Sequence, residues 1–127
     1  MSKIKVMLVD DHEMVRLGLK SFLNLHEDVE VIAEADDGED GLEKALSIKP
    51  DVIVMDLVMP KMTGVEATLA ILKEWKDAKI VILTSYLDNE KIYPVLEAGA
   101  KGYMLKTSSA EEILAAIRKV AKGQLAI

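Results

Sequence analysis

Short apolar runs that alternate with helix-like segments constrain the fold of this chain more than any other feature of its sequence. Residues 52–55 and 80–83 are apolar throughout, and such short continuous runs are typical of strands buried on both faces of a sheet. Strands that alternate with helices are joined by right-handed crossovers, which produce a parallel sheet with helices on both sides. We therefore predict an α/β fold.

The pattern predicts five strand–helix units in one domain. Strands are expected over residues 4–9, 29–33, 52–55, 79–83 and 102–105. Helices are expected over 12–25, 38–48, 63–75, 88–99 and 109–122. Residues 1–123 form the predicted domain, and residues 124–127 are expected to begin a linker.

Several helix ends have clear sequence signals. Thr63 with Glu66, and Ser109 with Glu112, form capping boxes that predict helix starts. Asp88 is the expected N-cap of the fourth helix, which should end at Gly99, with Gly123 likewise following the last helix. Pro94 interrupts the fourth helical segment, so we predict either a kink or a helix that begins near this proline.

Composition excludes several classes of function. The chain has 127 residues, no cysteine, two histidines and a net charge of −6. Disulfides and thiolate metal sites are therefore excluded, and a His-rich zinc site is disfavoured. The acidic balance disfavours binding of nucleic acid through its phosphates. No apolar run approaches membrane-spanning length and no signal peptide is evident, so a cytoplasmic protein without membrane contact is expected.

Polar residues stand at four predicted strand ends, where an α/β sheet places its chemistry. These are the pair Asp10 and Asp11, then Asp56, Thr84 and Lys106. Each alone has an ordinary explanation, such as a turn, a helix cap or an exposed lysine. Their joint occurrence at one sheet edge is the specific signal, and three carboxylates there favour a hard cation such as Mg²⁺, or Mn²⁺.

The same set can support phosphoryl transfer. A carboxylate such as Asp56 can act as a nucleophile and form an aspartyl phosphate. The Lys106 ammonium would neutralise charge on the phosphoryl group, and the Thr84 hydroxyl would donate to one of its oxygens. His12 is a weaker candidate as an extra ligand or base, because imidazole is a poor Mg²⁺ ligand. His26 is expected in a loop.

These motifs resemble the receiver domains of two-component response regulators over essentially the whole chain. The matching stretches are residues 9–12, 55–60 with Gly64, 83–85 and 98–106. The sequence of residues 9–16 and 105–109 is similar to that of the NarL/FixJ subfamily, and within it to cell-envelope stress regulators of the LiaR/VraR kind. The resemblance implies a flavodoxin-like, doubly wound (βα)5 fold with strand order 2-1-3-4-5.

The resemblance also implies roles for single residues. Asp56 would accept a phosphoryl group from a sensor histidine kinase. Asp10 or Asp11, with Asp11 preferred, would hold Mg²⁺ together with Asp56 and the main-chain carbonyl of Val58. Thr84 and Tyr103 would form the switch pair, and Lys106 would contact the phosphoryl group. Such a domain is a signalling module that catalyses its own phosphorylation and slow dephosphorylation, and is not otherwise an enzyme.

Output and lifetime are further expectations from the resemblance. Phosphorylation would favour a homodimer, for which Met14 and Leu17 form the predicted face on the first helix. Transcriptional control would need a C-terminal helix-turn-helix domain that this chain lacks, so it is either a receiver cut from a longer regulator or a stand-alone receiver. Val58 and Tyr86 flank the expected path of the hydrolytic water, and neither carries a carboxylate or amide that could orient it, which predicts a long-lived phosphoryl group.

One departure and three rival functions remain. Receivers commonly carry a proline with a cis bond after the lysine, whereas Thr107 follows Lys106 here, and we predict a trans bond. A haloacid-dehalogenase-type phosphatase would need an acid at Val58. A flavodoxin-like cofactor binder would need a phosphate-binding loop where Asp10 and Asp11 stand. A degenerate receiver that only binds proteins is disfavoured by the intact acidic set.

Overall fold

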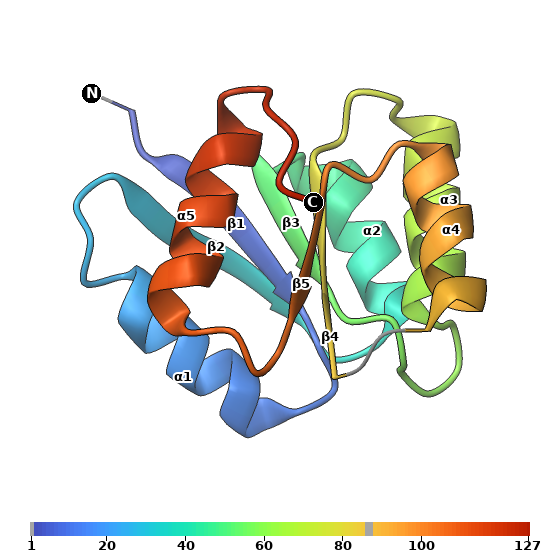
Figure 1. Ribbon diagram of the computed structural model, residues 1–127, viewed down its shortest axis with the longest axis horizontal. Coiled ribbons are helices and arrows are strands. Elements are labelled where there is room, and N and C mark those ends of the chain that lie inside the picture. The colour runs from blue at the N-terminus through green and yellow to red at the C-terminus, as the bar shows by residue number, and fades with distance from the viewer. Residues whose placement is uncertain (1, 86–87) are drawn as a thin grey trace.

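The computed structural model describes residues 2–85 and 88–127, in which strands and helices alternate (Figure 1). The strands are β1 (Ile4–Val9), β2 (Val29–Ala35), β3 (Val52–Met55), β4 (Ile80–Thr84) and β5 (Gly102–Leu105). The helices are α1 (Glu13–Leu23), α2 (Gly38–Ile48), α3 (Gly64–Glu74), α4 (Asn89–Ala98) and α5 (Ala110–Ala121). All strand pairs are parallel, in the order β2-β1-β3-β4-β5, which confirms the predicted flavodoxin-like topology.

Helices cover both faces of the sheet, with α1 and α5 on one side and α2, α3 and α4 on the other (Figure 1). Strand β3 shows why its residues are all apolar. Ile53 and Met55 belong to the core under α2, α3 and α4, whereas Val52 and Val54 belong to the core under α1 and α5. A strand that is buried on both faces needs apolar side chains at every position.

Strand β2 is longer than predicted. It continues to Ala35 because Ala33, Glu34 and Ala35 pair with the end of β1 after a register shift between Val6 and Met7. The sequence Ala-Glu-Ala is not apolar enough to predict this extension, which depends on the partner strand. Strand β4 likewise extends one residue further than predicted, so that Thr84 is its last residue.

The predicted caps are confirmed, including Asp88 for α4, but one of the two alternatives predicted for Pro94 is wrong. Both capping boxes form, and Gly99 has a φ of 120° after α4. Helix α4 begins at Asn89 and contains Pro94 in its interior, so it does not begin near the proline. The earlier start is set by Asp88, whose side chain accepts the Glu90 N–H and whose carbonyl accepts those of Lys91 and Ile92. The alternative, a kink at Pro94, stays a prediction.

The chain returns along the free edge of β5 after α5. The backbone N–H of Tyr103 donates to the Ala126 carbonyl at 3.0 Å, and the Ala126 N–H donates to the Lys101 carbonyl at 2.9 Å. Gly102 permits this approach, since an added Cβ would lie 3.3 Å from the Ala126 oxygen. Residues 124–127 therefore cover a sheet edge that would otherwise present unpaired backbone groups, and the boundary after residue 123 stays a prediction.

Candidate functional site

The predicted site residues meet at the carboxyl edge of the sheet because the hydrogen-bond ladder continues past the strand ends. The Asp56 N–H donates to the Val9 carbonyl at 2.9 Å, and the Lys106 N–H donates to the Thr84 carbonyl at 2.7 Å. These bonds fix the backbone of residues that follow β3 and β5 against neighbouring strands. The site is thus built on the rigid sheet, with its side chains at the start of the loops.

A buried pair of carboxylates faces the Lys106 ammonium. Asp10 and Asp56 are only 5% and 2% exposed. The Nζ atom of Lys106 lies 2.7 Å from Oδ2 of Asp10 and 3.3 Å from Oδ2 of Asp56. One ammonium therefore serves two buried acids, which leaves the cluster with excess negative charge.

Asp11 and His12 complete the cluster on its exposed side. The Nδ1 atom of His12 lies 2.8 Å from Oδ1 of Asp10 and 3.2 Å from Oδ1 of Asp11. Lys106 Nζ lies 3.2 Å from the same nitrogen. An imidazole nitrogen cannot donate and accept at once, so a hydrogen bond to Asp10 excludes one from Lys106. His12 therefore contacts the two acids at the exposed side of the cluster. His26 lies in the loop after α1, as predicted.

The acidic pair does not act as a helix cap. Asp10 lies before the first turn of α1, whose N-cap residue is His12. Instead, Oδ1 of Asp10 accepts the backbone N–H of His12 at 2.8 Å, which turns the carboxylate toward the cluster. The ordinary explanation of the Asp-Asp pair as a helix cap is therefore wrong, whereas its role in a turn is confirmed by this bond between Asp10 and the N–H two residues later.

The cluster fits a hard divalent cation. One ligand atom each from Asp10, Asp11, His12 and Asp56 lies within 4.8 Å of the others. Oδ2 of Asp10 and Oδ2 of Asp56 are buried without a well-directed hydrogen bond in the part of the chain that the structure describes. Mg²⁺ prefers carboxylate oxygens and keeps several waters, so this donor set suits it, and the half-exposed imidazole is not needed.

Electrostatics make Asp56 the unusual carboxyl group of the cluster. Burial, and after it the negative charge of Asp10, raise the pKa of Asp56 above its usual value. The Lys106 ammonium and the Val58 backbone N–H oppose this rise. A ligand that brings positive charge nearby, such as a divalent cation, would stabilise the ionised form of this carboxylate.

The expected switch residues, Thr84 and Tyr103, belong to the neighbouring strands β4 and β5. Thr84 is 3% exposed at the end of β4. Tyr103, on the neighbouring strand β5, packs against the core under α2, α3 and α4. Its hydroxyl is buried and has no hydrogen-bond partner among the described residues, and burial, followed by the charge of Asp88, raises its pKa. The described part of the chain has only trans peptide bonds, so the prediction for Lys106–Thr107 is confirmed.

Among the remaining predicted positions, Val58, Met14 and Leu17 have exposed side chains, and the Val58 backbone N–H bonds the Asp56 carboxylate. The Val58 residue is 47% exposed on the loop after β3. Met14 and Leu17 are 76% and 53% exposed on α1, as a binding face requires. Tyr86 lies outside the residues that the structure describes.

The loop after Asp56 is held by a glycine. The Gly64 N–H donates to the Leu57 carbonyl at 2.9 Å, and a Cβ on Gly64 would lie 1.8 Å from the Asp56 carbonyl oxygen. A side chain is therefore excluded where the start of α3 meets the backbone of the buried acid. The sequence identifies Gly64 as part of a motif but does not predict its contact with the Asp56 backbone.

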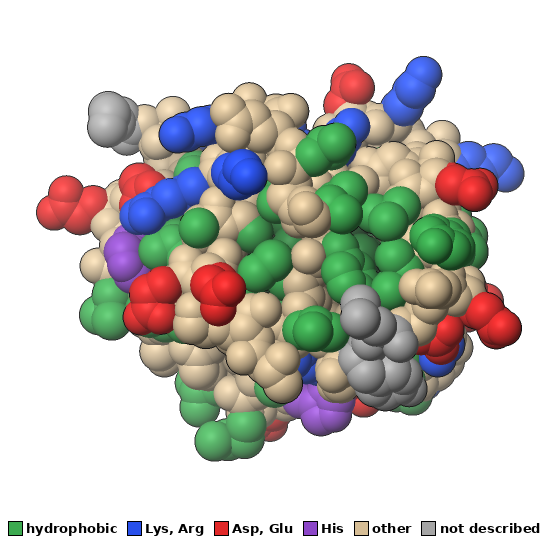
Figure 2. Space-filling view, in the orientation of Figure 1, with side chains coloured by type: hydrophobic (Ala, Val, Ile, Leu, Met, Phe, Trp, Pro, Cys, Tyr) green, Lys and Arg blue, Asp and Glu red, His purple; other side chains and the backbone are tan. Residues whose placement is uncertain are grey.

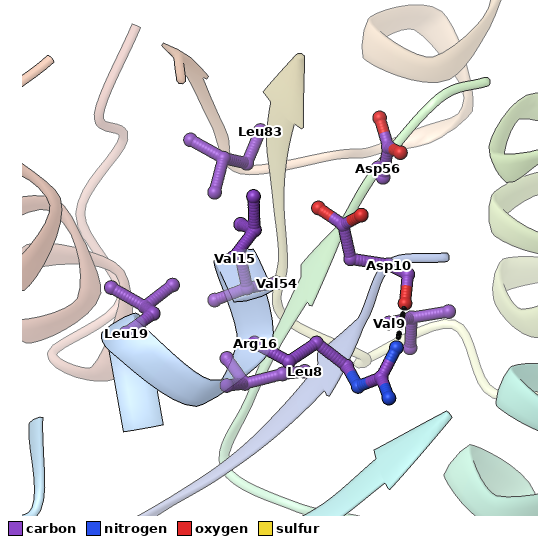
Figure 3. Close-up of a pocket in the computed structure, with 9 residues that line it drawn as sticks. All are labelled: Leu8, Val9, Asp10, Val15, Arg16, Leu19, Val54, Asp56 and Leu83. Carbon is purple, nitrogen blue, oxygen red and sulfur yellow. Dashed lines mark hydrogen bonds between the residues drawn. The ribbon is translucent and has the colours of Figure 1, made fainter. Parts of the chain in front are cut away.

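Sequence reasoning missed Arg16. This residue of α1 donates from its guanidinium to the main-chain carbonyl of Asp10, as the dashed line in Figure 3 shows, and from Nε to Glu34 at 3.2 Å. The only sequence signal is an arginine one turn after His12. Its partner on β2 could not be identified without the extension of that strand.

Comparison with known proteins agrees with this site. Residues 6–118 match the family model of the response regulator receiver domain. The chain is 56% identical to the transcriptional regulatory protein LiaR of Bacillus subtilis, over 95% of this chain and 57% of that protein. It is 48% identical to the response regulator protein VraR of Staphylococcus epidermidis, over 95% and 58% of the respective chains. The chain thus spans a little over half the length of these curated relatives.

Solved structures give the same result. A two-component response regulator of the LuxR family from Aurantimonas superimposes with a TM-score of 0.92 at 35% identity, over 99% of this chain and 90% of that one. The receiver domain of the putative response regulator NarL from Mycobacterium tuberculosis gives a TM-score of 0.90 at 33% identity, over 98% and 100%. With its acidic pocket of Asp10, Asp11 and Asp56 typical of phosphoacceptor sites, this chain belongs to the response regulator receiver domain family, and it is similar to LiaR, to VraR and to LuxR-family regulators.

Proposed function

We propose that this domain is the phosphoacceptor of a two-component system, with Asp56 as the residue that takes the phosphoryl group. The observation that supports this most directly is the buried Asp56 carboxylate, which shares the Lys106 ammonium with a second buried acid, Asp10, at the carboxyl edge of the sheet. The phosphoryl donor is a phosphohistidine of a sensor histidine kinase.

The transfer forms one bond and breaks one. A carboxylate oxygen of Asp56 attacks phosphorus, the phosphorus–nitrogen bond of the donor breaks, and its electron pair stays on the imidazole, which takes a proton from water. Lys106 stabilises the charge on the phosphoryl oxygens. Mg²⁺ or Mn²⁺, when bound by Asp10, Asp11, Asp56 and the Val58 carbonyl, would supply further positive charge toward those oxygens.

The phosphoryl group then acts as a switch. It adds negative charge and strong acceptor oxygens at the sheet edge, so the Thr84 hydroxyl moves toward it and Tyr103 follows into the space beside β4. Figure 2 shows hydrophobic side chains gathered on the face of the molecule that carries β5, toward α4. A change at Tyr103 would alter this face, which α4, β5 and α5 share.

The downstream output is dimerisation and control of transcription. The exposed Met14 and Leu17 on α1 support a two-fold contact between copies of the chain. The relatives LiaR and VraR are longer proteins, of which this chain spans 57% and 58%. DNA binding would be performed by a C-terminal helix-turn-helix domain outside this chain.

A small phosphodonor tests the proposal. Acetyl phosphate with Mg²⁺ should add one phosphoryl group to the chain, seen by intact-mass spectrometry. Chelation of the metal should suppress the addition, and Asp56→Asn should abolish it. Equal labelling of Asp56→Asn would refute the assignment of the acceptor.

A further inference from the structure

We infer that Arg16 is a positioning residue for the divalent-cation site. It acts through the main chain between Asp10 and Asp11, in the loop that joins β1 to α1. The inference rests on the proposed cation site and names a residue that holds its ligands in place. Arg16 belongs to α1, and its guanidinium donates to the carbonyl oxygen of Asp10 (Figure 3).

The contact acts on both acids because of peptide geometry. The Asp10 carbonyl and the Asp11 N–H lie in one planar peptide group. A guanidinium that holds this carbonyl therefore fixes the plane from which the two side chains project. On the other side of Asp10, its N–H donates to the Ala35 carbonyl at 3.1 Å. Both backbone groups of Asp10 are thus held.

Arg16 is itself braced against β2. Its Nε donates to Oε1 of Glu34 at 3.2 Å, and Lys20 pairs with Oε2 of the same carboxylate at 3.2 Å. The Arg16 side chain is 16% exposed, so it is largely shielded from water. The guanidinium is planar and has donors in a fixed arrangement, which lets one side chain hold a carbonyl and a carboxylate together.

Charge and position make opposite predictions for this residue. Arg16 brings a positive charge close to a cation site, so by electrostatics alone its removal should strengthen Mg²⁺ binding. If it orients the ligands, its removal should weaken Mg²⁺ binding instead. Loss of groups that orient metal ligands typically weakens binding by about 10-fold to 100-fold.

The test is a Mg²⁺ titration followed by backbone amide NMR shifts, without phosphodonor. Arg16→Met keeps the apolar stem and removes the donors, and should raise the Kd for Mg²⁺ about 10-fold or more. Lys20→Met is the matched control, because it removes the other positive partner of the Glu34 carboxylate and does not affect a contact to Asp10. The Kd of this variant for Mg²⁺ should equal that of wild type or be lower. With acetyl phosphate, Arg16→Met should regain the wild-type rate at saturating Mg²⁺, which a general structural defect would not allow.

Three outcomes overturn the inference while leaving the cation site in place. The first is a folded Arg16→Met that binds Mg²⁺ as tightly as wild type. The second is an equal loss of affinity in Lys20→Met, which would assign the effect to Glu34. If Arg16→Met does not fold, Arg16→Lys takes its place, and an unchanged Kd in that variant is the third. Failure of wild type to bind Mg²⁺ would instead refute the cation site itself, and the inference with it.

Discussion

The ammonium nitrogen of Lys106 lies 3.3 Å from Oδ2 of Asp56, although the two residues belong to loops that follow different strands. Strand β4 lies between those two strands in the sheet. The contact forms because Lys106 is anchored by its N–H to Thr84, the last residue of β4. The contact brings a buried carboxylate next to the positive charge that would stabilise a phosphoryl group on it.

The pH dependence of stability should reveal the burial of Asp56. Its pKa is raised above the usual 3.8, first by burial and then by Asp10. Between the usual and the raised pKa the folded state binds more protons than the unfolded state, so the free energy of unfolding falls as pH rises through this window. Asp56→Asn should therefore be more stable than wild type at neutral pH, by on the order of 1–3 kcal/mol.

Urea unfolding with a chelator present measures this effect. The stabilisation by Asp56→Asn should shrink as the pH is lowered and vanish below the usual pKa of 3.8, where both states of the wild type are protonated. Asp77→Asn, at an exposed position, is the control and should change little. Equal stability of wild type and Asp56→Asn at neutral pH would show that the buried carboxylate is not destabilising.

Gly64 and Gly18 should respond in opposite ways to the same substitution. A Cβ on Gly64 would lie 1.8 Å from the Asp56 carbonyl oxygen and 2.7 Å from Leu57 Cα, both backbone atoms. Gly64→Ala should therefore displace the loop that follows Asp56, destabilise the domain by about 1–3 kcal/mol and slow phosphorylation. Gly18, inside α1, has no atom within 4 Å of an added Cβ among the described residues.

Gly18→Ala should stabilise the domain by about 0.5–1 kcal/mol, because alanine favours a helix interior. Thermal unfolding and the rate of phosphorylation by acetyl phosphate measure both variants. A Gly64→Ala variant with wild-type stability and rate would mean that the loop has another conformation available.

How much of this could be read from the sequence depends on how local each feature is. The meeting of Asp10, Asp56, Thr84 and Lys106 was predictable, because parallel strands end at a common edge and the apolar runs mark where they end. The capping boxes were predictable from residues three apart. The start of α4 was predictable from its cap residue Asp88, whereas the alternative start near Pro94 was wrong because that cap already begins the helix.

Other features depend on contacts between distant segments. The extension of β2 to Ala35 requires its pairing with β1, and the pairing of Ala126 with Tyr103 requires the return of the chain past α5. The contact of Arg16 with the Asp10 carbonyl depends on the angle between α1 and the sheet. None of these follows from periodicity or from a short motif.

The lifetime of the phosphoryl group tests the role of the loop side chains. Val58 is 47% exposed two residues after Asp56, and neither it nor Tyr86 carries a carboxylate or amide that could orient an attacking water. The double variant Val58→Asn/Tyr86→Glu should lose the phosphoryl group about 10-fold to 100-fold faster, because it can orient that water. Val58→Ala cannot, and should decay like wild type. Decay is followed after removal of the donor, and unchanged decay of the double variant would exclude this explanation.

The dimer face is tested by charge. Met14 and Leu17 are 76% and 53% exposed on α1, so an aspartate at position 14 should be tolerated by the monomer and should oppose association of two such faces. Met14→Asp should remain monomeric after phosphorylation in sedimentation velocity, whereas wild type should dimerise. Leu69→Asp, at a 40% exposed position on α3, is the control and should dimerise. Dimerisation of phosphorylated Met14→Asp would place the contact elsewhere.

The identity of the acceptor is tested most directly by trapping the acyl phosphate. Borohydride reduces an acyl phosphate to an alcohol but leaves free carboxylates unchanged, so a phosphorylated aspartate becomes homoserine. After treatment with acetyl phosphate and Mg²⁺, peptide mass spectrometry should find homoserine at position 56, and none when the metal is chelated. Homoserine at position 10 or 11 instead, or a phosphorylated chain without homoserine at 56, would contradict the account.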